Sequence, residues 1–203
     1  MICILQIFDQ EGEQDMYKIC HTEESSHRQR ALEQGLLRAL EHQSYAKITL
    51  TGLCGQLGVP RKTFYRYFPS KEDCLLSLID HTLSDCNDTA LGGWSGTEVL
   101  DEKVQVRFFR FWLEHASFLD AIEANGFRYL LLDRTTAIVD RMKETRPCES
   151  FAVDQVEYFV AHGLMTTVLR WHHHGFPSSP EEMAALFGKL LQNPELSVSR
   201  LLL

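Results

Sequence analysis

Apolar residues recur at helical spacing along most of this 203-residue chain. The first such run predicts a helix over residues 27–42, with Ser25 or Ser26 as its N-terminal cap. Further runs with the same period begin after Thr49 and continue to Leu191. No segment alternates apolar and polar residues in the way that a half-exposed strand does. The pattern therefore predicts an all-α protein.

A glycine separates two short apolar stretches that follow the first helix. Thr49 is a suitable N-cap for the first stretch, and Gly58 supplies the conformational freedom for a sharp turn after it. In the second stretch Phe64 and Phe68 lie one helical turn apart and can pack inward together with Val59. Two helices joined by a glycine turn form a helix–turn–helix, a unit that many proteins place in the DNA major groove.

The charge of this segment is opposite to that of the whole chain. Residues 43–71 contain five basic residues and no Asp or Glu, whereas the chain carries a formal net charge of −8. An acidic body repels nucleic acid and leaves one cationic face to engage it. The outer surface of the second helix holds two i,i+4 pairs: Arg61 with Tyr65, and Lys62 with Arg66. A solvated helix face is the simpler interpretation of such a charge run, but the glycine and aromatic positions favour DNA binding.

The order of these residues closely resembles the DNA-binding domain of TetR-type bacterial regulators over about residues 28–80. The motifs that carry the resemblance are Thr49-Leu-x-x-Leu-Cys-x-x-Leu-Gly-Val59, Thr63-Phe-Tyr-x-Tyr-Phe68 and Pro69-Ser-Lys-Glu72. The resemblance implies a three-helix domain in which the start of the third helix meets bases, while Tyr65 and Lys71 hold phosphates. The DNA contacts expected on this basis are Thr49, Arg61, Lys62, Thr63, Tyr65, Arg66 and Lys71.

Two positions in this region depart from the family pattern, and a third has two possible roles. Pro60 stands where the family usually has a Ser or Thr cap, although proline tolerates a helix start. Lys62 replaces a residue that is typically small, so operator readout is expected to differ from that of relatives. For Tyr67, packing in the core and contact with the DNA backbone are both open.

Beyond Lys71 the pattern stays helical nearly to the end of the chain. A helix that begins at Lys71 is expected to connect the two parts of the protein. Residues 92–96 mark the clearest break, and Thr97 is expected to open an aromatic-rich helix. Two long helices, over residues 150–174 and from Pro180, carry small residues on apolar faces, which suits close helix packing. In TetR-type proteins such helices pair with their copies in a four-helix dimer interface; a purely intrachain core is the alternative.

The resemblance also implies an effector cavity in the larger domain. Its candidate residues are Phe108, Phe111, Trp112, His115, Tyr129, Arg134 and His162. The aromatic members of this set are more typical of a core than of a pocket. The polar members lie on apolar stripes and need partners when buried. For Arg134 an internal ion pair is favoured over an anionic ligand.

The sequence also argues against other classes of function. His172, His173 and His174 are consecutive, so on a helix their imidazoles point about 100° apart and cannot converge on one metal ion. There is no G-x-S-x-G motif and no glycine-rich phosphate loop, and we expect neither catalysis nor a cofactor. No stretch reaches the roughly 18 apolar residues of a membrane helix. The six cysteines form no C-x-x-C pair, which fits a reducing cytoplasm.

We therefore predict a homodimeric transcriptional repressor that a small-molecule effector releases from an inverted-repeat DNA operator. Residues 1–26 are expected to be a flexible extension, residues 27–70 the DNA-binding domain, and residues 71–203 the effector-binding and dimerisation domain. One alternative is a regulator-like protein that acts through a protein partner, such as a coactivator, without an effector of its own. The basic group with Tyr65 and Lys71 favours DNA over that alternative. An α-helical enzyme is the other alternative, and the sequence contains no catalytic constellation in its support.

Overall fold

The structure is a computed structural model, and it describes residues 17, 20, 22–92, 101–145 and 150–192. This part of the chain is helical and contains no strand, which confirms the predicted all-α class. The elements are α1 (Glu23–His42), η2 (Tyr45–Lys47), α2 (Leu50–Gln56), α3 (Arg61–Tyr65), α4 (Lys71–Asp85), η3 (Cys86–Leu91), α5 (Glu102–Glu114), α6 (Ala116–Ala124), α7 (Arg128–Thr145), α8 (Phe151–His173) and α9 (Pro180–Gln192).

The first helix begins earlier than the sequence predicted. Thr22 caps it, because its side-chain oxygen accepts a hydrogen bond from the backbone N–H of Ser25 at 3.3 Å. Ser25 and Ser26, the predicted caps, therefore lie inside the helix. Glu23 and Glu24 occupy its first turn, where negative charge is favourable. The last four residues of the predicted flexible extension are consequently helical.

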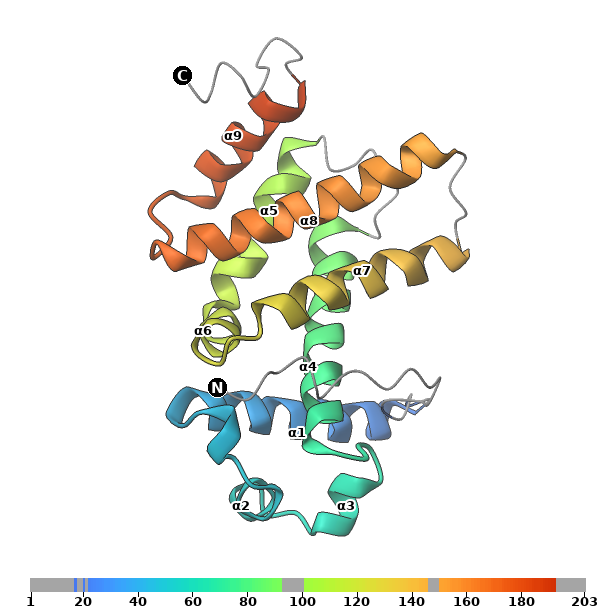
Figure 1. Cartoon of the computed structure of the whole chain (residues 1–203), viewed down its shortest axis with the longest axis vertical. Helices are drawn as coiled ribbons and strands as arrows, with labels where there is room; N and C mark the ends of the chain where they lie inside the picture. The colour runs from blue at the N-terminus through green and yellow to red at the C-terminus, as the bar shows by residue number, and fades with distance from the viewer. Residues whose placement is uncertain (1–16, 18–19, 21, 93–100, 146–149, 193–203) are drawn as a thin grey trace.

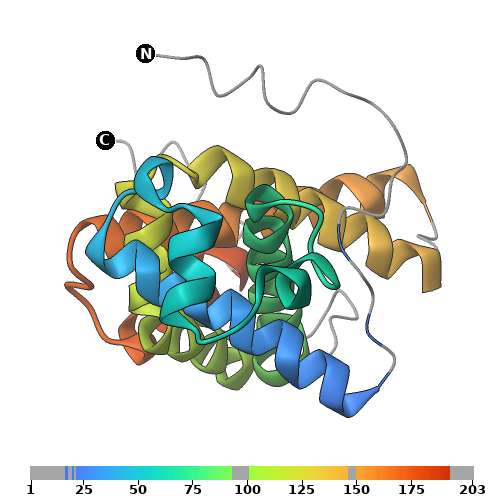
Figure 2. The ribbon, with the colours of Figure 1, turned by 90° about the horizontal axis from the view of Figure 1, so that it is seen from below.

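Helices α1, α2 and α3 form a small domain at one end of the molecule, and Figure 2 looks at this end. Its core contains Leu53, Phe64 and Phe68, each at most 1% exposed. Helices α1 and α2 approach closely at Gly35, where an added Cβ would lie 2.5 Å from a methyl carbon of Leu57. A glycine within α1 thus lets Leu57 pack directly against the helix backbone.

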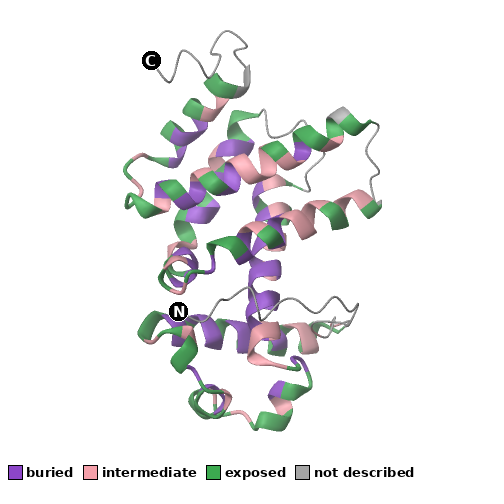
Figure 3. Ribbon diagram, in the orientation of Figure 1, coloured by how far each residue is buried: buried purple, intermediate pink, exposed green. Residues whose placement is uncertain are grey.

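Helix α4 connects this domain to the remaining helices. Ser70 caps it by accepting a hydrogen bond from the backbone N–H of Asp73 at 3.1 Å, so the helix begins at Lys71 as the sequence predicted. Figure 1 shows α4 running from α1 into the middle of the larger domain, and Figure 3 shows it buried along most of its length. Beyond Asp85 it continues as the π-helix η3, which ends at Gly92 with a φ of 70°.

The remaining helices surround the upper part of α4 and bury an aromatic core. Helix α5 packs against α9, and α7 packs against α8. The largest fully buried side chains of this core are Trp112, Phe109, Phe118, Leu119, Ile122 and Leu131. Asp101 caps α5; the predicted helix start at Thr97 lies outside the described residues. A break at His115, which the apolar period did not predict, separates α5 from α6.

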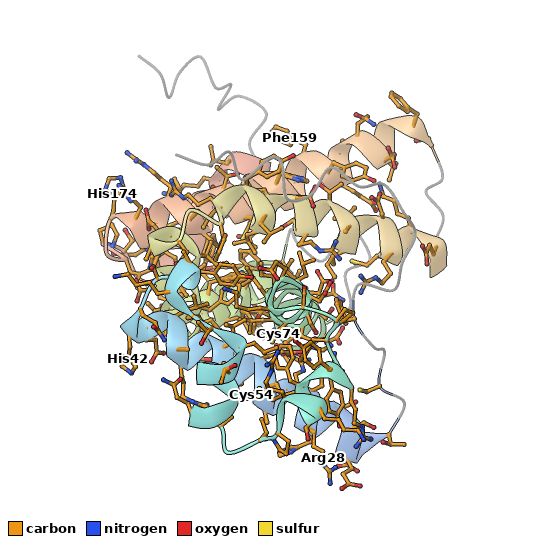
Figure 4. All side chains as sticks on the ribbon, turned by 60° about the horizontal axis from the view of Figure 1, so that its bottom comes forward. Arg28, His42, Cys54, Cys74, Phe159 and His174 are labelled. Carbon is orange, nitrogen blue, oxygen red and sulfur yellow. The ribbon has the colours of Figure 1, made fainter. Side chains whose placement is uncertain are left out.

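The apolar residues of α8 divide between two faces. Leu164, Val168 and Trp171 are at most 4% exposed and pack within the chain. Val156 and Phe159 are 59% and 77% exposed, and Figure 4 shows Phe159 directed away from the other helices. An intrachain core therefore accounts for only one face of α8.

Candidate nucleic-acid interface and effector cavity

Helices α2 and α3 form a tight helix–turn–helix. Thr49 caps α2, because its side-chain oxygen accepts a hydrogen bond from the backbone N–H of Gly52 at 3.1 Å. Gly58 has a φ of 65°, a left-handed conformation that glycine adopts without steric cost. The backbone N–H of Val59 then donates to the carbonyl oxygen of Cys54 at 3.0 Å. The predicted cap and turn are confirmed, and together they fix the direction of α3 relative to α2.

The region of α3 presents one buried face and one exposed face. Phe64 and Phe68 are both 0% exposed, and their ring centres lie 5.3 Å apart. The side chains of Arg61, Lys62 and Arg66 are exposed on the other side. Figure 3 shows how much of the outer surface of α2 and α3 is open to solvent. The buried phenylalanines therefore anchor a short helix whose solvent side is cationic.

The two predicted tyrosines of this segment have different positions. The hydroxyl of Tyr65 accepts a hydrogen bond from Arg61 Nη2 at 3.1 Å, and Tyr65 remains 49% exposed. Tyr67 is 3% exposed, so of its two open interpretations the structure supports packing in the core. Thr63 is half-buried. Among these residues Tyr65 is the accessible aromatic side chain, next to the Arg61 guanidinium.

Lys71 lies at the start of α4 and holds the segment that connects α1 to α2. Its Nζ donates hydrogen bonds to the carbonyl oxygens of Tyr45 and Ile48, both at 2.9 Å. The ammonium nitrogen also lies 3.9 Å from the centre of the Tyr45 ring. Partial burial lowers the pKa of this amine. Two of its three protons are used within the chain, a structural role that the sequence did not predict; its phosphate role remains a prediction.

The same segment joins the helix–turn–helix domain to the turn between α6 and α7. The backbone N–H of Tyr45 donates to Asn125 Oδ1 at 2.7 Å, and the rings of Tyr45 and Phe127 meet edge to face at 5.1 Å. Asn125 Nδ2 in turn donates to the carbonyl oxygen of Ala121 in α6 at 2.9 Å. A displacement of α6 would therefore be transmitted to η2. The sequence contained no signal for this contact.

Two buried polar clusters join α4 to its neighbours. In the first, Arg134 of α7 donates two hydrogen bonds to Asp80 of α4, both at 2.6 Å. This confirms the internal ion pair favoured for Arg134. In the second, Glu33 of α1 accepts a hydrogen bond from Ser77 Oγ at 2.6 Å and lies 2.8 Å from Nδ1 of His81. Helix α4 is thus held by the larger domain and by the helix–turn–helix domain on adjacent turns.

A largely apolar cavity of about 70 Å³ lies among α4, η3, α5, α7 and α8. It is several times larger than the roughly 10–15 Å³ that one water molecule needs. Its apolar wall includes Leu83, Cys86, Phe108, Trp112, Ile138 and Leu164. An apolar cavity of this kind favours an organic molecule over water.

The structure places only part of the predicted effector set in this cavity. Phe108 and Trp112 line it. Phe111 does not: its ring stacks on that of His115 with the ring centres 3.9 Å apart. His115 Nδ1 also lies 2.7 Å from the carbonyl oxygen of Phe111. The apolar period could not separate these positions, because α5 is buried on most of its faces.

The other three predicted effector residues also lie outside the cavity wall. Tyr129 is 73% exposed on α7, and Arg134 is already paired with Asp80. His162 Nε2 lies 3.0 Å from the hydroxyl of Thr136, and the residue lines an outer groove along α8. Of the seven predicted residues, only Phe108 and Trp112 therefore line this cavity, and whether any of them binds an effector stays a prediction.

The consecutive histidines face carboxylates of α6. His172 Nε2 lies 2.8 Å from Asp120 Oδ1, and its Nδ1 lies 3.1 Å from Glu123 Oε2. A hydrogen bond with His173 lowers the pKa of the Glu123 carboxyl, with smaller contributions from neighbouring cations. These contacts join α6 to α8. In the part of the chain that the structure describes, no group of three potential ligands is arranged for a metal ion.

Comparison with known proteins agrees with the geometry of the helix–turn–helix. Residues 35–78 match the family described as "Bacterial regulatory proteins, tetR family". The chain is 54% identical over 43 residues to the HTH-type transcriptional regulator EthR of Mycolicibacterium smegmatis, a match that covers 21% of this chain and 20% of that relative. Residues 35–78 are therefore similar in sequence to the DNA-binding domain of TetR-type regulators.

The larger domain has a counterpart among solved structures. The dihydroxyacetone kinase operon activator DhaS superimposes with a TM-score of 0.55 at 16% sequence identity, over 81% of this chain and 93% of that one. At this identity the likeness shows a shared fold. Within the described residues, no helix is both long and apolar enough to cross a membrane.

Proposed function

We propose that this protein is a homodimeric transcriptional repressor that a small molecule releases from an inverted-repeat operator. The observation that carries the proposal is the cationic, exposed side of α3, held in place by Phe64 and Phe68, within an otherwise acidic chain. A local cationic surface on an acidic protein favours docking of an anionic partner at that surface and disfavours it elsewhere.

The proposed DNA contacts follow from exposure and from the position of each residue in the helix–turn–helix. Arg61 and Lys62 occupy the first turn of α3, where side chains reach base edges in the major groove. Arg66 and Tyr65 follow at the C-terminal end of α3, where phosphates pass. Thr49 and Thr63 can add hydroxyl contacts to the backbone, and Lys71 has one proton left for a phosphate.

A dimer interface is proposed on the outer face of α8. Val156, Phe159, Gly163 and Thr166 recur there at intervals of three and four residues, so they share one stripe along the helix. Large apolar side chains at one end and small residues at the centre suit close packing of a second helix. Two copies related by a two-fold axis would present two α3 helices to DNA, which requires an inverted repeat.

The apolar cavity is proposed as the effector site. Its wall includes Cys86 and Leu91 of the π-helix η3, which directly continues α4. Short π-helical segments occur frequently at functional sites. A ligand that prefers the DNA-incompetent state tenfold supplies about 1.4 kcal/mol per site, and operator DNA must weaken ligand binding by the same factor.

Selection of binding sites from a pool of random DNA duplexes tests this proposal. The protein should enrich a motif with two inverted halves, spaced so that one face of the duplex meets both α3 helices. Enrichment of a single asymmetric half-site would contradict the dimeric arrangement. No enrichment over the starting pool, at low salt and micromolar protein, would contradict specific DNA recognition itself.

A further inference from the structure

The indole of Trp112 contains a hydrogen-bond donor that has no strong acceptor within the described residues. Trp112 is 0% exposed and lines the apolar cavity. Its Nε1 donates to no nitrogen or oxygen acceptor among the described residues. A buried N–H without an acceptor is destabilising, and native proteins rarely contain one without a function. Trp171 provides a contrast, because its Nε1 donates to the carbonyl oxygen of Ser178 at 3.1 Å.

The Cys86 thiol does not provide the strong acceptor that the Trp112 N–H lacks. Cys86 also lines the cavity, and burial strongly raises the pKa of its thiol, while a weak hydrogen bond with the Trp112 indole opposes this effect. The thiol therefore stays protonated at neutral pH. A neutral thiol is a weak acceptor, so the indole N–H still lacks a strong one.

The other polar side chains of the cavity wall already have partners. Thr135 donates to the carbonyl oxygen of Leu131 at 2.9 Å. Asn87 donates to Asp88 at 3.1 Å. Glu157 lies 3.8 Å from the ammonium group of Lys143. The wall is thus mostly apolar, and it includes Trp112, whose indole N–H lacks a strong acceptor.

We infer that the effector is a small neutral molecule, mostly apolar, whose one acceptor oxygen receives the hydrogen bond of the Trp112 indole. A ketone, lactone or ester carbonyl has this chemistry. An ionised ligand would have to lose its hydration in an apolar cavity, at a large cost in free energy. Met142 and Met165 also line the wall, and their flexible side chains let the cavity adapt to ligand shape. This inference rests on the proposed effector role of the cavity.

Three probes of similar size test the inference: cyclopentanone, cyclopentane and cyclopentylammonium. Binding to the ¹⁵N-labelled full-length protein is followed by the indole N–H signals of its three tryptophans. Cyclopentanone should bind with a saturable titration curve and move the Trp112 signal downfield, as expected for a new hydrogen bond. The Trp171 signal should stay in place. Cyclopentane should bind without this downfield shift. The ammonium probe should not bind.

Replacement of the donor sharpens the comparison. Trp112→Phe should reduce the preference for the ketone over the hydrocarbon by roughly three- to tenfold, which is the contribution of one hydrogen bond. Trp171→Phe is the matched control and should leave the preference unchanged. A ketone preference that survives Trp112→Phe, or equal downfield shifts with ketone and hydrocarbon, would overturn the assignment. So would binding of the cation in place of the ketone.

The design separates this inference from the function on which it rests. If none of the three probes binds at millimolar concentration, the ligand class is wrong. Selection from random duplexes, performed without any probe, then still decides whether the protein recognises DNA. If Trp112→Phe does not fold, the wild-type comparison of ketone with hydrocarbon gives the answer without the variant.

Discussion

Arg134 of α7 holds Asp80 of α4 in a bidentate ion pair that is almost completely buried. Arg134 Nε and Nη2 each lie 2.6 Å from a different oxygen of Asp80, whose side chain is 1% exposed. The hydroxyl of Tyr17, which precedes α1, donates to the same carboxylate at 2.5 Å. Because α4 connects the helix–turn–helix domain to the larger domain, this ion pair fixes the connecting helix against α7.

Arg134→Met should destabilise the folded protein by about 3–5 kcal/mol, because it leaves a buried carboxylate without its cation. Arg141→Met is the matched control: Arg141 lies 3.8 Å from the same carboxylate, but its side chain is 53% exposed. The control should cost ~1 kcal/mol or less. Urea unfolding measures both values. Equal losses would show that the buried contact is not the stronger one.

Lys71→Met should affect both stability and DNA binding. Loss of the two hydrogen bonds to Tyr45 and Ile48 should lower the free energy of unfolding by about 1–3 kcal/mol. Loss of the phosphate contact should weaken all duplexes alike and reduce the salt dependence by about one unit. Arg66→Met is the comparison, since Arg66 is exposed and should change only DNA affinity. An unaltered salt dependence in Lys71→Met would remove Lys71 from the phosphate role.

Stability should fall at alkaline pH through the buried thiols. Burial raises the pKa of the Cys74 thiol well above its ordinary value of about 8.5. Below that value the thiol is protonated in both the folded and the unfolded protein, so the stability that its burial contributes is fully present there. It is lost as pH rises towards the native pKa, because only the unfolded thiol ionises in that window. Urea unfolding between pH 7.5 and 10 should show a shallower decline for Cys74→Ala than for wild type.

The half-buried Cys20 provides the control for this measurement. Cys20→Ala should reproduce the wild-type decline of stability with pH. The comparison uses the slope with pH, so any cavity that Cys74→Ala creates affects all points alike. Identical slopes for wild type and Cys74→Ala would show that this thiol does not contribute.

Phe159→Glu should convert the proposed dimer to a folded monomer. A charge in the centre of an apolar interface is strongly unfavourable. In the single chain Phe159 is 77% exposed, so its replacement should leave the fold intact. Tyr129→Glu is the matched control, because Tyr129 is a similarly exposed aromatic residue on α7. Sedimentation velocity at micromolar concentration distinguishes the two forms. A Phe159→Glu dimer would place the interface elsewhere.

Local chemistry made the helix–turn–helix predictable. The caps at Thr49 and Ser70 and the turn at Gly58 each depend on a residue and its neighbours a few positions away, which a sequence displays directly. The ion pair of Arg134 was also anticipated, because a buried guanidinium needs a counter-charge. Its partner, Asp80, was not, since the two residues are 54 positions apart.

The apolar cavity proposed for the effector was harder to predict for a physical reason. Apolar spacing shows that Phe108, Phe111 and Trp112 are buried but not which of them borders empty space. That depends on how α5 meets α4, α7 and α8. The outer face of α8 is a similar case, because spacing identified an apolar helix but only the packed structure shows that Phe159 is largely exposed.

The most direct test of DNA recognition through α3 is the base preference of Lys62→Ala. Titration by fluorescence anisotropy compares wild type and variant on the selected duplex and on its set of single-base substitutions. Lys62 is exposed in the first turn of α3, so its loss should change discrimination at particular base pairs by ~1–3 kcal/mol. The remaining positions should keep their relative affinities. An identical preference at every position, with only a uniform loss of affinity, would contradict base reading by Lys62 in α3.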